Sequence, residues 1–262
     1  MSITVILTVY KRPQVLIEQI NAIMAQTIKP EKILILKNFV EGVELPVIPD
    51  ELSKNISIVE STENFGVWGR FAIGLLANTE YICIFDDDTI PMKKWFENCL
   101  NTIKEYPGLL GTNGVIFDKG DSYNFNSYKN IGWIGEKNDK TTEVDIVGHA
   151  WFFKREWLNY LWEYTPNYTN VLAAGEDIAF SAMLQKHSIK TYVPPHPEND
   201  KDLWGSNPDT GFKYGRNAVA TSINGLSEFE KVLKDFIHSK GYITINNRVP
   251  SGGRKSRSRK NR

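Results

Sequence analysis

The stretch "YICIFDDDTIP", residues 81–91, joins an apolar run to three consecutive aspartates and a proline. The apolar run is typical of a buried strand, and the carboxylates after it repel one another and are costly to bury without partners. In an extended segment Asp86 and Asp88 share one face, and Asp87 points to the other. Two carboxylates at a strand end suit a hard divalent cation, Mg²⁺ or Mn²⁺. A helix cap formed by Asp87 is the alternative, but it explains one aspartate and not three.

The segments before this stretch have alternating strand and helix patterns. Apolar β-branched runs predict strands, and apolar residues three to four positions apart predict helices. The predicted order is strand, helix, strand, strand, helix, strand, helix at residues 3–10, 13–26, 31–38, 56–61, 65–78, 80–87 and 91–106. This order indicates an α/β fold with a mostly parallel central sheet flanked by helices. In such a sheet ligands bind beyond the carboxyl ends of the strands, where the three aspartates fall.

The second half of the chain is less regular, and nothing in it marks a separate domain. Residues 143–164 are expected to pass from a strand to a helix near Lys154. Further strands are expected at 109–117 and 189–195, and further helices at 175–188 and 226–241. The polar stretches 118–143 and 196–225 are expected to be irregular, and a loop as long as the second is usually disordered or functional.

Composition and charge narrow the classes of partner. The 262 residues fit one large α/β domain, and 41% hydrophobic residues suffice for a core. The formal net charge is zero, but residues 251–262 hold six basic residues and no acid, so the rest of the chain carries about −6. An acidic body argues against nucleic acid as the main partner. The basic tail is expected to be disordered, with contact to an anionic membrane as the lesser option.

The cysteines and the N-terminal residues predict the cellular compartment of the protein. Cys83 and Cys99 lie in a predicted strand and a predicted helix without C-x-x-C spacing, so we expect buried, reduced thiols and a reducing compartment. The apolar run at the N-terminus is too short to span a membrane and lacks the pattern of a signal peptide. We therefore expect a soluble, cytoplasmic protein.

Several motifs in a fixed order carry a family resemblance. "TVYKRP" (8–13) and "ENFGVWGRF" (63–71) lie at strand–helix junctions, with glycines that let the backbone approach a ligand and arginines that can hold a phosphate. Together with "FDDD" they resemble the nucleotide-binding half of GT-A fold glycosyltransferases of family 2. "VDIVGHAWFFKREWL" (144–158) and "AAGEDIAFSAML" (173–184) continue this resemblance, and they are also similar to exostosin-like family 64 domains.

The resemblance implies a single-domain GT-A (Rossmann-like) fold. Its donor-binding half would be residues 1–117, and its acceptor-binding and catalytic half would be 118–240. The implied reaction is metal-dependent transfer of a sugar from a nucleotide-diphosphate donor, preferably a UDP-sugar, to a hydroxyl of a glycan or glycoconjugate. Family 2 implies inversion at the anomeric carbon, whereas exostosin-like domains retain its configuration. Because Gly175 replaces the exostosin-type cysteine, inversion is the preferred alternative.

The resemblance also implies roles for single residues. The donor-binding residues would be Thr8, Tyr10, Arg12, Asn64, Arg70, Asp86 and Asp87. The metal, Mn²⁺ or Mg²⁺, would be held by Asp88, Asp86 and His196. Asp177, with Glu176, would face the reacting sugar and take the proton of the acceptor hydroxyl. Candidates for contact with the acceptor are Trp133, His149 and Trp204.

The same residues also allow other structural and functional interpretations. Glu176 and Asp177 begin a predicted helix, where acids favour the positive end of the dipole, and that dipole would lower the pKa of Asp177. "FDDDTI" also nearly fits phosphatases of the haloacid-dehalogenase type, with Asp86 as nucleophile, but their aspartates end the first strand of the fold. A carbohydrate-binding protein on a transferase fold would show no donor turnover.

Overall fold

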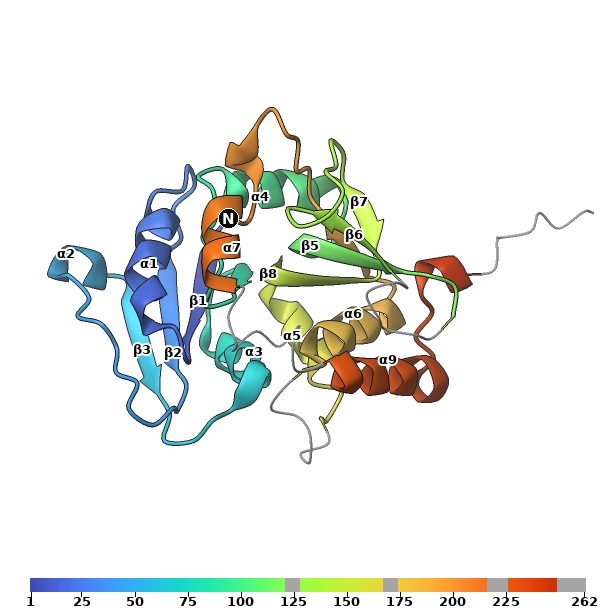
Figure 1. Ribbon diagram of the computed structural model, residues 1–262, viewed down its shortest axis with the longest axis horizontal. Coiled ribbons are helices and arrows are strands. Elements are labelled where there is room, and N and C mark those ends of the chain that lie inside the picture. The colour runs from blue at the N-terminus through green and yellow to red at the C-terminus, as the bar shows by residue number, and fades with distance from the viewer. Residues whose placement is uncertain (121–127, 167–173, 216–225, 249–262) are drawn as a thin grey trace, which may run out of the picture.

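The computed structural model describes residues 1–120, 128–166, 174–215 and 226–248, so the basic tail 251–262 lies outside the described residues. Figure 1 shows a central sheet with helices on both sides. The strands are β1 (Ile3–Val9), β2 (Lys32–Lys37), β3 (Ile56–Glu60), β4 (Tyr81–Phe85), β5 (Gly108–Phe117), β6 (Tyr128–Gly132), β7 (Thr142–Val144), β8 (Ile146–Lys154) and β9 (Lys190–Val193). The helices are α1 (Leu16–Met24), α2 (Asp50–Ser53), α3 (Gly69–Ile73), α4 (Trp95–Glu105), α5 (Leu158–Leu161), α6 (Glu176–Lys186), α7 (Pro208–Gly215) and α9 (Leu226–Lys240).

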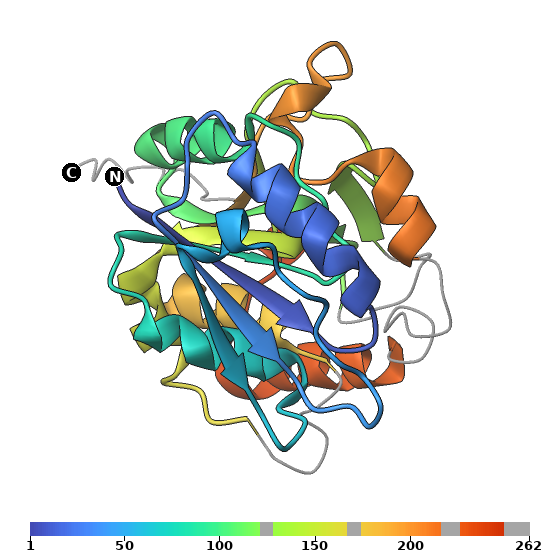
Figure 2. The same cartoon turned by 90° about the vertical axis from the view of Figure 1, so that its left-hand side faces the viewer.

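The strands form one sheet of nine in the order β3-β2-β1-β4-β8-β5-β9-β7, with β6 paired to β5. The N-terminal half of this sheet is parallel, because β1 pairs in parallel with β2 and β4, and β2 with β3. Helical segments connect β1 to β2 and β3 to β4, as parallel pairing requires. Figure 2 shows α1 lying against this part of the sheet.

The expectation of a mostly parallel sheet does not hold for the C-terminal half. There β8 runs antiparallel to both of its neighbours, β4 and β5. β6 is antiparallel to β5, and β7 is antiparallel to β9. Among the strands of this half that the structure describes, β5 and β9 are the parallel pair. The sheet is therefore mixed, and the carboxyl end of β4 lies opposite Ala150, in the middle of β8.

Helices cover both faces of the sheet. In Figure 1, α4 lies above β5 and β8, whereas α5, α6 and α9 lie below them. The inward side of α1 consists of Leu16, Gln19, Ile20 and Ile23, all buried at helical spacing. Cys83 and Cys99 are buried in the same core and form no disulfide. No helix in the described ranges has the length and apolar character that a membrane span needs.

Two predicted helices and one stretch that was expected to be irregular differ from the structure. Residues 66–76 form two 3-10 turns on either side of α3 and not one continuous helix. Gly69 packs closely on the sheet, since a Cβ there would lie 2.8 Å from Leu36. α4 begins at Trp95 and not at Pro91. The stretch 196–225, expected to be irregular, contains α7.

Candidate active site

The acidic stretch that follows β4 lies at the carboxyl ends of the parallel strands. Gln19 of α1 holds it from one side by donating to the carbonyls of Asp86 at 2.6 Å and Thr89 at 2.9 Å. From the other side, the Asp86 N–H donates to the carbonyl of His149 in β8 at 3.0 Å. The turn is thus anchored to two elements that are distant in sequence. Gln19 could have been found from the sequence, because it is a polar residue on the apolar side of a predicted helix.

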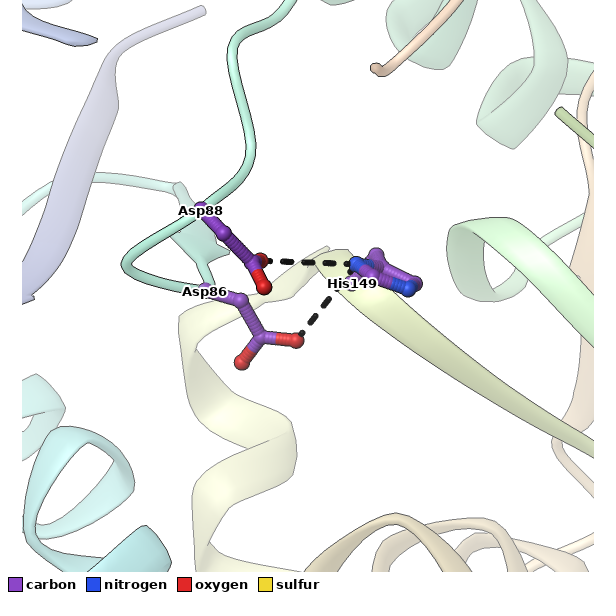
Figure 3. A group of neighbouring side chains, drawn as sticks. All are labelled: Asp86, Asp88 and His149. Carbon is purple, nitrogen blue, oxygen red and sulfur yellow. Dashed lines mark ion pairs between the residues drawn. The ribbon is translucent and has the colours of Figure 1, made fainter. Parts of the chain in front are cut away.

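Asp86, Asp88 and His149 form a cluster that could hold a metal ion. One ligand atom from each lies within 4.8 Å of the other two. The Nδ1 atom of His149 is 3.7 Å from Asp88 Oδ1 and 3.8 Å from Asp86 Oδ2, and the three side chains point toward one another in Figure 3. Two carboxylates and an imidazole are a suitable donor set for a divalent transition metal. The residues present therefore fit the predicted ion. His149, which the sequence suggested as an acceptor contact, is a candidate third ligand.

Tertiary pairing brings His149 to this place. β4 and β8 are antiparallel with Phe85 opposite Ala150, so the next position along β4 lies across from His149. His149 has φ +65°, a left-handed conformation that is unfavourable for a side chain with a Cβ. Thr89 stabilises this backbone by donating its hydroxyl to the His149 carbonyl at 3.0 Å.

Each of the three aspartates faces a different basic partner. Asp87 pairs with Arg12, which follows β1, and Asp86 pairs with Arg70 of α3. Asp88, whose residue is 8% exposed, lies between His149 and Arg12, the latter at 3.7 Å. These partners offset the repulsion that the sequence implies. Asp87 thus forms an ion pair and is not seen as a helix cap.

The pKa values follow from burial and from these pairs. Burial raises the pKa of Asp87 to about 6, although Arg12 opposes the shift. Burial would also raise the pKa of Asp88, but His149 and Arg12 outweigh it and lower the pKa. For His149, burial opposes protonation, but Asp88 and Asp86 prevail and raise the pKa. Asp88 and His149 therefore each favour the charged form of the other.

A second carboxylate pair begins α6. Glu176 accepts a hydrogen bond from Arg70 at 2.7 Å, and Asp177 accepts one from the Ile178 N–H at 2.7 Å. The pKa of Asp177 is raised well above that of a free aspartate, first by burial and then by the charge of Glu176. The expectation that the helix dipole lowers this pKa is wrong, because desolvation and a neighbouring carboxylate outweigh the dipole.

The predicted nucleotide-binding residues near β1 and β3 are joined in one network. Asn64 donates to the Tyr10 hydroxyl at 3.2 Å and accepts from Asn38 at 2.8 Å. Asn38, which follows β2, is buried and was not singled out from the sequence. The buried hydroxyl of Thr8 has no hydrogen-bond partner among the described residues. A buried polar atom of this kind can be satisfied by a ligand.

Two predicted site residues, His196 and Trp204, are buried outside the cluster of Asp86, Asp88 and His149. His196 is fully buried, with Nε2 2.9 Å from the Thr112 hydroxyl and Nδ1 2.8 Å from the Pro194 carbonyl, and burial lowers its pKa to about 4. It is not part of the cluster of Asp86, Asp88 and His149, so its assignment as a metal ligand is not supported. Trp204 is buried and packs beside His196.

Trp133 is close to the site but is not an exposed platform for a sugar. It is 3% exposed, its ring lies 5.0 Å from that of His149, and Phe212 of α7 covers it at 5.3 Å. A Cβ on Gly211 would meet the Trp133 ring at 2.7 Å, so α7 packs directly on it.

Comparison with known proteins identifies the family of this chain. The sequence model of the family described as Glycosyl transferase family 2 matches residues 4–162, which include both predicted nucleotide-binding motifs, the three aspartates and His149. No curated protein matches the chain. The similarity to exostosin-like domains stays a prediction, and membership of a transferase family argues against the phosphatase and the non-catalytic alternatives. On the family match and the mixed α/β sheet, this chain belongs to glycosyl transferase family 2 and has its GT-A fold.

Proposed function

We propose that the protein transfers a sugar from a nucleotide-diphosphate donor, preferably a UDP-sugar, to a hydroxyl of a glycan or glycoconjugate, with inversion at the anomeric carbon. The observation that carries this proposal is the cluster of Asp86, Asp88 and His149 at the carboxyl ends of the parallel strands. Its position within the family match supports a donor site there. Residues 1–117 would bind the donor, and 118–240 would bind the acceptor and catalyse transfer. A cytoplasmic location belongs to the same proposal.

Asp86, Asp88 and His149 would hold Mn²⁺ or Mg²⁺. A bound divalent ion offsets the negative charge on the leaving diphosphate. Mg²⁺ prefers oxygen ligands, whereas Mn²⁺ accepts an imidazole nitrogen more readily. The presence of His149 therefore favours Mn²⁺.

Asp177 would act as the base. The acceptor oxygen forms a bond to the anomeric carbon, the bond from that carbon to the diphosphate oxygen breaks, and Asp177 takes the proton of the acceptor hydroxyl. Its raised pKa makes it a stronger base than a free aspartate. Thr8, Tyr10 and Asn64 would contact the nucleoside, and the unpartnered hydroxyl of Thr8 supports this role.

The test is a screen of UDP-, GDP- and TDP-sugars with Mn²⁺, scored for donor hydrolysis and for thermal stabilisation. Wild type should turn over one of these donors. Asp88→Ala and His149→Ala should weaken Mn²⁺ binding by about tenfold or more, since each removes a ligand. Asp50→Ala, an exposed aspartate on α2, is the matched control and should leave Mn²⁺ binding unchanged.

The anomeric configuration of the transferred sugar, read by NMR, decides between inversion and retention. If no nucleotide sugar is turned over or stabilises the protein, and Asp88→Ala behaves like wild type, the proposed function is wrong.

A further inference from the structure

Arg70 lies where the proposed metal site and the proposed catalytic helix meet. Its two terminal nitrogens bind different carboxylates, Nη1 that of Asp86 and Nη2 that of Glu176. These partners are separated from Arg70 by 16 and 106 residues, so the contact joins α3, the turn after β4 and the start of α6. The three residues belong to three different motifs of the sequence.

The guanidinium is held firmly in this position. Arg70 is 7% exposed, and its guanidinium carbon lies 4.4 Å from the centre of the Trp151 ring. Burial by itself would lower the pKa of Arg70, but Asp86 and Glu176 outweigh it and raise the pKa. A buried cation is tolerated only when its charge is compensated, so the arginine needs its two acidic partners.

The hydrogen bond to Asp86 determines which carboxylate oxygen faces the metal-binding cluster. Arg70 engages Oδ1, and Oδ2 lies 3.8 Å from Nδ1 of His149. The hydrogen bond to Glu176 holds the start of α6 in place, because Glu176 is the first residue of that helix. Asp177 follows it directly. One side chain thus orients a proposed metal ligand and the residue next to the proposed base.

We propose that Arg70 is a positioning residue that holds the metal-facing oxygen of Asp86 and the start of α6, with Asp177, in one fixed geometry. The proposal rests on the proposed function and deepens it, since it links metal binding to the placement of the base. It assigns Arg70 to the carboxylates of the protein, where the sequence suggested a contact to the donor phosphate. Glu176 becomes a positioning partner in place of a catalytic residue.

The experiment compares Arg70→Lys with wild type in the full-length protein. A lysine keeps the charge but cannot fork between two carboxylates. Binding of Mn²⁺ alone, measured by calorimetry, should weaken by about tenfold, as expected when the partner of a metal ligand is lost. With the donor found in the screen, kcat at saturating Mn²⁺ should stay about tenfold or more below wild type, because the base is displaced as well. Arg155→Lys, whose arginine donates to the Leu75 carbonyl, is the matched control and should change neither quantity.

Two results would overturn the bridging role. One is an unchanged Mn²⁺ affinity in Arg70→Lys. The other is full recovery of kcat at saturating Mn²⁺, which would confine Arg70 to the metal side.

If Arg70→Lys shows no cooperative melting, Glu176→Ala decides, because it removes the acceptor on α6 and leaves Asp86 and its arginine in place. There kcat should fall by about tenfold or more at unchanged Mn²⁺ affinity, and a wild-type kcat would refute the proposal. If wild type itself binds no Mn²⁺ and turns over no nucleotide sugar, the proposed function fails and the bridging role fails with it.

Discussion

Three consecutive carboxylates coexist after β4 because each faces a different basic side chain. Asp86 faces Arg70, Asp87 faces Arg12, and Asp88 faces His149. The cations come from α3, from the segment after β1 and from β8, so the acidic stretch is compensated only when these elements are assembled. A metal bound by two of the aspartates would therefore enter a site that the protein has already arranged.

The raised pKa of Asp177 predicts the pH dependence of transfer. A base must be deprotonated to act, and burial together with Glu176 keeps Asp177 protonated to a higher pH than a free aspartate. Activity should therefore rise with pH, and its acidic limb should lie above the pH at which free aspartate titrates. Glu176→Gln removes a like charge, lowers the pKa of Asp177 and should move this limb to lower pH. The measurement is kcat against pH at saturating donor and Mn²⁺, and an acidic limb that stays in place in Glu176→Gln would contradict the assignment.

The start of α6 depends on a glycine. Gly175 precedes the helix with φ +104°, and a Cβ there would lie 3.0 Å from Val232 of α9. Gly175→Ala should cost about 1–2 kcal/mol of stability through the left-handed backbone alone. It should also lower kcat, because α6 carries Asp177. Gly148→Ala is the control, since a Cβ there meets no atom within 4 Å. Equal melting temperatures for Gly175→Ala and wild type would refute the argument.

Helix α7 covers Trp133 and lies close to Asp88. Gly211 and Phe212 pack on Trp133, and a Cβ on Gly215 would lie 3.2 Å from Asp88 Oδ2. The Tyr214 hydroxyl donates to Glu18 of α1 at 2.6 Å. An element that the composition of 196–225 did not reveal thus covers Trp133 beside the cluster of Asp86, Asp88 and His149.

Asp145, which lies between β7 and β8, joins the segment after α9 to the end of β5. Its carboxylate accepts from the N–H groups of Phe117 at 2.8 Å and Ile245 at 2.7 Å, and its carbonyl accepts from the Tyr242 hydroxyl at 2.6 Å. Asp145→Asn would turn an amide donor toward one of these N–H groups. It should therefore lower the free energy of unfolding by about 1–3 kcal/mol, measured by urea denaturation.

The same residue predicts how stability changes with pH. Burial raises the pKa of Asp145 to about 6, whereas a free aspartate titrates near 3.9. The folded state therefore holds this proton more tightly than the unfolded state, and stability should fall as pH rises from about 4 to about 6. Asp145→Asn should lack this contribution. A wild-type and a variant curve of equal slope over this interval would contradict the prediction.

Much of the fold could be predicted from local pattern. The strand at residues 3–10, the strand that ends at Phe85 and the helix that begins near Gly175 are all present within a few residues of their expected ends. Runs of β-branched residues and helical spacing report on burial of one segment, and that is a local property. The family resemblance was confirmed for the same reason, since it rests on short motifs in a fixed order.

The sequence by itself determined that an acidic stretch follows a buried strand in an α/β domain of this transferase family, and that Asp86 and Asp88 are candidates to hold one cation. Only the tertiary structure decided their third partner, because the antiparallel insertion of β8 beside β4 places His149 across from Asp86. It likewise decided that His196 and Trp204 are buried and that Arg70 joins Asp86 to Glu176. The physical reason is that periodicity shows which side of a strand or helix is apolar, whereas a binding site depends on which elements become neighbours.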